Sequence, residues 1–139
     1  MIRVVIDSNV VVAAIRSKVG WSHKLVFSIG VDHRWQACLS GPLLQEYTEQ
    51  TLSHAHIPGW LGEECEDFLD YLCQSSRWCE NHFLWRPLLQ DADDHMVVEA
   101  AVASSAEYII TFNKSDLKPA EAFGITLMTP REFLLHLAK

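Results

Sequence analysis

The chain opens on a short β-branched run that ends abruptly in polar residues. Residues 2–6 read Ile-Arg-Val-Val-Ile, and Asp7, Ser8 and Asn9 follow at once. The next stretch, residues 9–17 (NVVVAAIRS), is apolar on several faces and suits a buried helix that Ser8 or Asn9 would cap. A strand that leads into such a helix is the first unit of a parallel α/β sheet. Because ligands bind at the carboxyl ends of such strands, Asp7 is expected where chemistry is done.

The same alternation of strands and helices continues along the chain. Further strands are predicted at residues 36–40, 108–111 and 125–128, with short strand pieces between 78 and 85. Further helices are predicted at residues 22–29, 42–52, 63–75, 95–105 and 131–138. Ser22, Pro42, Thr129 and Pro130 supply expected helix starts. We therefore expect one α/β domain over residues 1–139, with a parallel sheet covered by helices on both faces.

The composition predicts a folded protein that does not enter a membrane. The 139 residues are 49% hydrophobic and 21% charged, and no apolar run approaches the roughly 18 residues of a membrane span. Arg3 and Asp7 interrupt the first apolar stretch and no secretory cleavage site follows, so the expected compartment is the cytoplasm. The four cysteines form no CxxC pair and are expected to be reduced thiols.

The net charge limits how the chain could bind nucleic acid. Eleven basic and eighteen acidic residues give a formal charge of −7. This charge argues against binding through a broad basic surface. It is compatible with a protein that reaches phosphates through bound cations, because clustered carboxylates are what such cations require.

Carboxylates from distant parts of the sequence are expected to meet at one edge of the sheet. Asp7 follows the first strand, Glu46 lies early in the helix after the middle strand, Asp94 begins a later helix, and Asp116 follows a later strand. Such a cluster repels itself unless it is protonated or holds a cation such as Mg²⁺ or Mn²⁺. The chemistry would then be hydrolysis of a phosphodiester by metal-activated water. Helix capping explains Asp94 and Asp91 about equally well, and a glutamate such as Glu46 is ordinarily solvated.

Four segments, in their order and spacing, carry a family resemblance. They are VVIDSNVVVAA, LSGPLLQEYTEQTL, DADDHMVVEAAVASSAEYIITFNKSDL and FGITLMTPREFLLHL. Together they cover nearly the whole chain, and they resemble the PIN domain of the VapC-like toxins of bacterial toxin–antitoxin systems. The resemblance implies a three-layer α/β/α sandwich and a ribonuclease that depends on Mg²⁺ or Mn²⁺. It also implies RNA as substrate, often a homodimer, and an antitoxin protein as partner.

The resemblance assigns roles to individual residues. Asp7, Glu46 and Asp94 match the acidic triad of the family, which implies that they are catalytic and bind the metal. Ser8 and Asn9 match the small polar residues that support the first aspartate.

The fourth acidic position is where this chain departs from the family pattern. Relatives often have Gly-Asp after the last threonine, whereas Phe112 and Asn113 stand here. Asp116 is therefore the candidate for the fourth catalytic acid, with Asn113 as a hydrogen-bonding support. Asp91 could serve a second metal or only the start of its helix, and the second interpretation is favoured.

Two other classes of function stay open at the level of sequence. A phosphoryl-accepting receiver domain also groups acids at strand ends with a late threonine and lysine, and Thr111 and Lys114 superficially suit it. However, the first strand supplies one acid only, and the QACLSGP segment supplies none. A PIN-like binding module without nuclease activity is the other alternative, and Asn113 is the residue that favours it.

Aromatic and basic side chains could also contact RNA. The five tryptophans are expected in the core or in a dimer interface rather than stacked on bases; they are Trp21, Trp35, Trp60, Trp78 and Trp85. Lys114 and Lys118 near the proposed site, and Arg16 and Lys18 after the first helix, could touch phosphate, although exposed cations usually contact only water.

Overall fold

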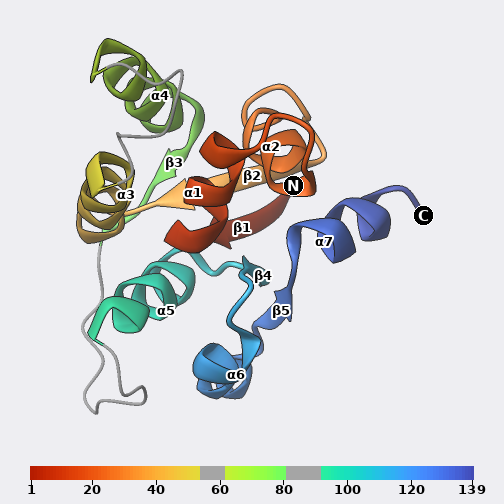
Figure 1. Cartoon of the computed structure of the whole chain (residues 1–139). Coiled ribbons are helices and arrows are strands. Elements are labelled where there is room, and N and C mark those ends of the chain that lie inside the picture. The colour runs from red at the N-terminus through yellow and green to blue at the C-terminus, as the bar shows by residue number, and fades with distance from the viewer. Residues whose placement is uncertain (54–61, 81–91) are drawn as a thin grey trace.

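Five short parallel strands form one sheet in the part of the chain that the structure describes. The computed structural model describes residues 1–53, 62–80 and 92–139, except for the side chains of residues 62, 63 and 92–94. The strands are β1 (Ile2–Ile6), β2 (Trp35–Leu39), β3 (Arg77–Trp78), β4 (Tyr108–Ile110) and β5 (Thr126–Met128), in the spatial order β3-β2-β1-β4-β5 (Figure 1). The parallel α/β architecture predicted from the sequence is confirmed.

The helices occupy the segments between these strands and after the last one. They are α1 (Ser8–Arg16), α2 (Trp21–Val26), α3 (Gly41–Ser53), α4 (Gly62–Ser75), α5 (Ala92–Ser104), α6 (Lys114–Leu117) and α7 (Pro130–Leu137), with the 3₁₀ helix η1 (Lys118–Phe123) between α6 and β5. No helix among the described residues is both long and apolar enough to cross a membrane. The four cysteines are free thiols, as expected. Of the strand pieces predicted between residues 78 and 85, the part at 81–85 lies outside the described residues.

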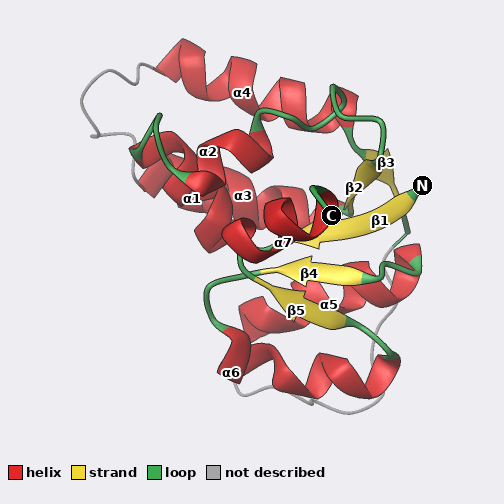
Figure 2. Cartoon of the chain, turned by 90° about the vertical axis from the view of Figure 1, so that its right-hand side faces the viewer, coloured by secondary structure: helices red, strands yellow, loops and turns green. Residues whose placement is uncertain are grey.

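The alternation of side chains along β1 and β2 places helices on both faces of the sheet. Ile2 pairs with Trp35 in the register of the two strands, so these side chains point to the same face. On that face Trp35 meets the ring of Phe133 in α7 edge to face, with ring centroids 5.5 Å apart. Arg3 points the other way and donates through Nη1 to the carbonyl of Ser104 in α5 at 3.0 Å. Helices α7 and α5 therefore lie on opposite sides of the sheet (Figure 2).

Helix α5 runs opposite to the strands that it covers. Its last turn reaches the start of β1 through the Arg3–Ser104 bond. Its middle lies nearer the carboxyl ends of the strands. There Cys79 Sγ, just after β3, donates to the carbonyl of Ala100 at 3.7 Å. The first turn of α5 consequently lies at the carboxyl edge of the sheet.

The strand order reverses direction between β1 and β4. From β1 the chain moves outward through β2 to β3, and from β4 it moves the opposite way to β5. In open α/β sheets ligands bind in the crevice at such a switch point, outside the carboxyl ends of the strands. A receiver domain instead has the order 2-1-3-4-5, so the strand order excludes that fold.

Two predicted helix starts differ in outcome. Thr129 forms a reciprocal cap at α7, because its Oγ1 accepts from the Glu132 N–H at 3.2 Å and its own N–H donates to Glu132 Oε1 at 2.9 Å. The prediction that Ser22 caps α2 is wrong. Gly20 is the cap residue, and Ser22 lies buried inside the helix. Gly20 has extended backbone angles (φ −82°, ψ 167°), so the helix begins at Trp21, one residue before Ser22.

Candidate functional site

Asp7 follows β1 and is the cap residue of α1. Its backbone makes both connections, so its carboxylate remains free to bind other groups. Its N–H continues the sheet ladder by donating to the carbonyl of Ile110 at 2.9 Å. Its carbonyl accepts from the Val10 N–H at 3.0 Å and starts the helix, so Asp7 is the cap residue rather than Ser8 or Asn9. The side chain takes no part in the cap. The buried carboxylate, 5% exposed, is directed to the switch point instead.

Thr111 fixes that carboxylate from the neighbouring strand. Its Oγ1 donates to Asp7 Oδ2 at 2.8 Å and accepts from the N–H of Asn113 at 2.9 Å. The second contact orients the hydroxyl, since a threonine has one proton to donate and that proton is then directed to Asp7. Sequence reasoning did not assign this support to Thr111. The signal that could have found it is its position at the end of the strand that pairs with β1.

Burial gives Asp7 an environment that disfavours its charge. Desolvation raises the pKa of the Asp7 carboxyl, and the nearby charge of Asp116 raises it further. The hydrogen bonds from Thr111 and from the backbone of Ser8 act in the opposite direction and lower it, but less strongly. A buried carboxylate with this balance is stabilised when a cation approaches it.

Glu46 is the second buried carboxylate of the site. It lies on the inward face of α3 with Leu43 and Tyr47, at the spacing that puts side chains on one side of a helix. Ser40 begins this helix, because its Oγ accepts from the Leu43 N–H at 3.3 Å. Glu46 is 5% exposed, so it is not the solvated glutamate that a lone residue of this type usually is.

Helices α1 and α3 bring Glu46 close to Asp7. Ser8, the residue after Asp7, places its Oγ 3.5 Å from Glu46 Oε1. Tyr47, the residue after Glu46, donates through its hydroxyl to the carbonyl of Ile6, the residue before Asp7. Burial and the nearby charge of Asp7 raise the pKa of Tyr47, so its hydroxyl stays protonated as a donor. Two contacts thus join the short segment around Asp7 to the segment around Glu46.

Asp94 belongs to the first turn of α5, and only its backbone position is described. Ten residues of helix separate it from Ser104, or about 15 Å at 1.5 Å per residue. Four residues of strand separate Asp7 from Arg3, or about 13 Å at 3.3 Å per residue. Ser104 and Arg3 are hydrogen bonded, and α5 runs opposite to β1. The backbone of Asp94 therefore lies at about the same height along the strand direction as Asp7.

The fourth acidic position involves Asp116 and Asn113 in different ways. Asp116 is exposed in α6 and lies near enough to Asp7 to act on its pKa. Asn113 contacts the site through its backbone N–H, while its side chain is exposed. Lys114, between them, forms an ion pair with Glu132 that lowers the pKa of this glutamate to about 2. Asp91 lies outside the described residues.

A family comparison agrees with this arrangement. The family model described as the PIN domain matches residues 3–115. The chain belongs to the PIN domain family. The match contains β1 with Asp7, α3 with Glu46, the first turn of α5 with Asp94, and β4 with Thr111. Membership of the PIN domain family, which the sequence motifs indicate, is therefore confirmed.

Solved structures share the fold of this PIN domain at low sequence identity. A chain in the crystal structure of VapBC2 from Rickettsia felis, bound to a DNA fragment from their promoter, superposes with a TM-score of 0.62 at 14% identity, over 92% of this chain and 98% of that one. A chain of FitAcB from Neisseria gonorrhoeae gives a TM-score of 0.53 at 13% identity, with the same coverage. No curated protein sequence matches this chain. The three-layer sandwich expected of a PIN domain is confirmed.

The chemistry of the donor set fits a hard divalent cation. Asp7 and Glu46 contribute carboxylate oxygens, and Asn9 contributes a buried Oδ1 that has no hydrogen-bond partner among the described residues. Such oxygens are the ligands that Mg²⁺ takes from proteins. The residues with described side chains contain no group of three or more candidate ligands; the triad of this PIN domain would need Asp94, whose side chain is outside that description.

Proposed function

We propose that this PIN domain is an endoribonuclease that depends on Mg²⁺ or Mn²⁺. The observation that carries the proposal is that two buried carboxylates, Asp7 and Glu46, lie on segments joined through Ser8 and Tyr47 at the switch point of the sheet. Burying two like charges together is costly unless a cation or a proton compensates them. Membership of the PIN domain family supports the same conclusion.

The proposed reaction is the addition of water to an RNA phosphodiester. An oxygen–phosphorus bond forms from water, the bond to the leaving oxygen breaks, and a proton ends on that oxygen. A divalent cation, when bound, polarises the phosphodiester and lowers the pKa of water. Asp7, Glu46 and Asp94 would hold this cation, while Thr111 keeps Asp7 in a fixed rotamer. Asp116, exposed beside Asp7, is our candidate to accept the proton of the attacking water.

We further propose a biological setting for this activity. The chain would be the toxin of a toxin–antitoxin pair, with an antitoxin protein as partner, a homodimer as its assembly and the cytoplasm as its compartment. The sequence resemblance to VapC-like toxins and the shared fold with the VapBC2 and FitAcB chains support this setting.

Cleavage of a labelled single-stranded RNA by the purified protein tests the activity. We expect cleavage with Mg²⁺ or Mn²⁺ and none with EDTA or in the Asp7→Asn variant. Cleavage that persists in Asp7→Asn would show that the activity does not come from this site. RNA binding without cleavage in the wild-type protein would favour the alternative, a PIN-like binding module.

A further inference from the structure

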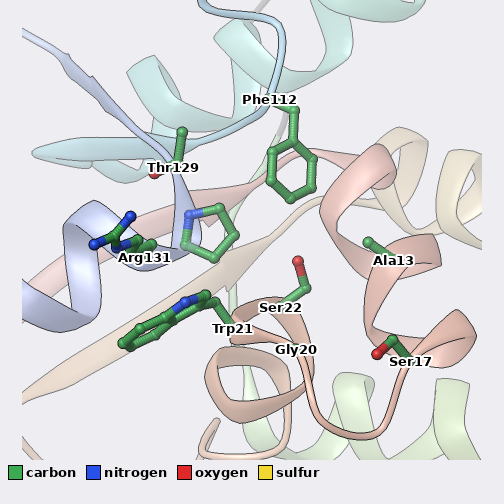
Figure 3. Close-up of a pocket in the computed structure, with 9 residues that line it drawn as sticks. Ala13, Ser17, Gly20, Trp21, Ser22, Phe112, Thr129 and Arg131 are labelled. Carbon is green, nitrogen blue, oxygen red and sulfur yellow. The ribbon is translucent and has the colours of Figure 1, made fainter.

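A pocket of about 370 Å³ opens on the face of the sheet that carries α1, α2 and α7, and Phe112, the residue after Thr111, lines it. Its wall is mostly apolar and comes from four separate segments: the end of α1, the start of α2, the residue after Thr111, and the start of α7 (Figure 3). The function proposed above gives this pocket no role. Its volume is at the small end of the range for ligand sites, which suits one flat ring system.

Two exposed aromatic rings line this pocket. Phe112 lines it from the segment after β4 and Trp21 lines it from the start of α2 (Figure 3). Phe112 is 51% exposed and Trp21 is 41% exposed, although both are residues that proteins normally bury. Of the other tryptophans with described side chains, Trp35 is in the core, as expected. Trp21 and Trp78 are exposed, so for these two only the dimer-interface part of the expectation stays open.

The backbone connects this pocket directly to Asp7. Thr111 directs its hydroxyl to Asp7, and Phe112, one residue later, lines the pocket on the other face. Consecutive Cα atoms are about 3.8 Å apart, so the wall of the pocket begins one residue from the group that holds Asp7. A polymer that crosses the edge of the sheet at Asp7 can therefore place an adjacent unit in the pocket.

Basic residues lie in or next to the segments that line the pocket, in a chain that is acidic as a whole. Arg131 lines it, and Lys24 places its Nζ 5.1 Å from the ring centroid of Trp21. Arg16 and Lys18 are exposed on either side of Ser17, another lining residue. The sequence has no acidic residue from position 8 to position 31, and the acid beside Arg131 is neutralised by its ion pair with a lysine. This distribution favours a polyanion as the occupant.

We propose that the pocket binds one base of a single-stranded RNA, next to the phosphodiester that the active site cleaves. Phe112 and Trp21 would stack on the base, and Arg131, with the basic residues next to the lining segments, would contact the flanking phosphates. Proteins recognise single-stranded RNA by this combination of aromatic stacking and basic side chains. The inference rests on the proposed function for its substrate class, but RNA binding can be measured independently of cleavage.

Equilibrium binding without metal tests the stacking. A fluorescein-labelled single-stranded oligoribonucleotide of eight residues is titrated with the Asp7→Asn protein in EDTA, followed by anisotropy. Adding Phe112→Ala or Trp21→Ala should weaken binding about tenfold, the order of loss for one stacking ring. The matched controls are Phe123→Ala and Trp78→Ala, which remove rings of similar exposure, 44% and 50%, outside the pocket. They should bind like the parent protein.

An abasic oligonucleotide separates contacts to the base from contacts to the backbone. We expect the abasic oligonucleotide to bind the parent protein about tenfold more weakly than the intact one does. The Phe112→Ala protein should bind both oligonucleotides with similar affinity, because the substitution already removes the contact that the missing base would make. Equal binding by the Phe112→Ala and Phe123→Ala proteins would overturn the proposal and leave the pocket to another occupant, such as a protein segment. A different result would separate the two proposals. If Phe112→Ala weakens RNA binding but the wild-type protein does not cleave RNA, the proposed pocket is supported and the proposed nuclease activity is contradicted.

Discussion

The hydroxyl of Thr111 in the segment after β4 donates to the carboxylate of Asp7 at the end of β1, with 2.8 Å between the two oxygens. The contact crosses the switch point of the sheet and joins residues 104 positions apart in sequence. The proposed metal ligand is thereby held by the neighbouring strand rather than by its own helix. Loss of the hydroxyl should consequently disturb the site without removing any ligand.

The Thr111→Val variant tests this support. Valine keeps the shape of threonine but cannot donate to Asp7 or accept from the Asn113 N–H. We expect RNA cleavage and Mn²⁺ affinity to fall 10- to 100-fold, as is usual when a partner of a metal ligand is removed, and stability to fall by about 1–2 kcal/mol. Kinetics and urea unfolding measure both effects. Thr111→Ser, which keeps the hydroxyl, is the control, and equal activity of the valine and serine variants would show that the hydrogen bond is irrelevant.

Glu46 and Glu49 provide a matched pair on α3. Glu46 is buried and within 3.5 Å of Ser8, whereas Glu49 is exposed less than one turn away. Glu46→Gln should reduce cleavage more than about 100-fold, because it removes a ligand rather than a supporting group. Glu49→Gln makes the same chemical change and should retain activity. If both variants cleave RNA at the same rate, Glu46 has no part in the site.

Asp7 should make stability depend on pH in the absence of divalent cations. Its folded-state pKa is raised above 3.8, so the folded protein holds this proton more tightly than the unfolded chain does. The resulting stabilisation is complete below the unfolded pKa and is lost as pH rises through the folded pKa. In EDTA at pH 7 we therefore expect Asp7→Asn to melt at a higher temperature than the wild type, with a difference that shrinks toward pH 4.

Thermal melts across pH 4–8 measure this difference. Mn²⁺ should raise the melting temperature of the wild type at pH 7 and leave Asp7→Asn unchanged, because ligand binding stabilises only the protein that binds. A wild type that is more stable than Asp7→Asn in EDTA at pH 7 would mean that the buried carboxylate is already compensated without metal.

Asn113 and Asp116 should respond differently to substitution. Asn113→Ala keeps the backbone N–H that reaches Thr111, so cleavage should change by less than about threefold. Asp116→Asn removes the charge beside Asp7 and the candidate proton acceptor, and we expect a loss of about tenfold or more, in the usual range for an acid–base group. Single-turnover cleavage rates compare the two. A larger loss in Asn113→Ala would assign the fourth position to the Asn113 side chain.

Much of the fold could be predicted because local signals were strong. The β-branched run of β1 is buried on both faces, as a central parallel strand requires. Helix α7 starts at Thr129 and Pro130 as predicted. The prediction of one domain over residues 1–139 stays a prediction. The helix starts at α1 and α2 were missed by one or two residues, because several adjacent residues there can serve as a cap.

The candidate site was predictable only where side chains follow strand ends or helix starts. Asp7 and Glu46 could be found that way, because each lies in a position that the topology brings to the carboxyl edge. The roles of Thr111 and Tyr47 depend on which strands are neighbours and on the register between them, and a single sequence does not specify either. The exposure of Trp21 likewise depends on how α2 packs, so the pocket that it lines was not foreseen.

The central claim is that Asp7, Glu46 and Asp94 share one bound divalent cation, and calorimetric titration with Mn²⁺ tests it most directly. We expect the metal-free wild type to bind Mn²⁺ with a measurable heat. Asp7→Asn, Glu46→Gln and Asp94→Asn should each lose that heat, while Glu49→Gln should keep it. Binding of Mn²⁺ by all three triad variants with wild-type affinity, or no binding by the wild type, would contradict the account.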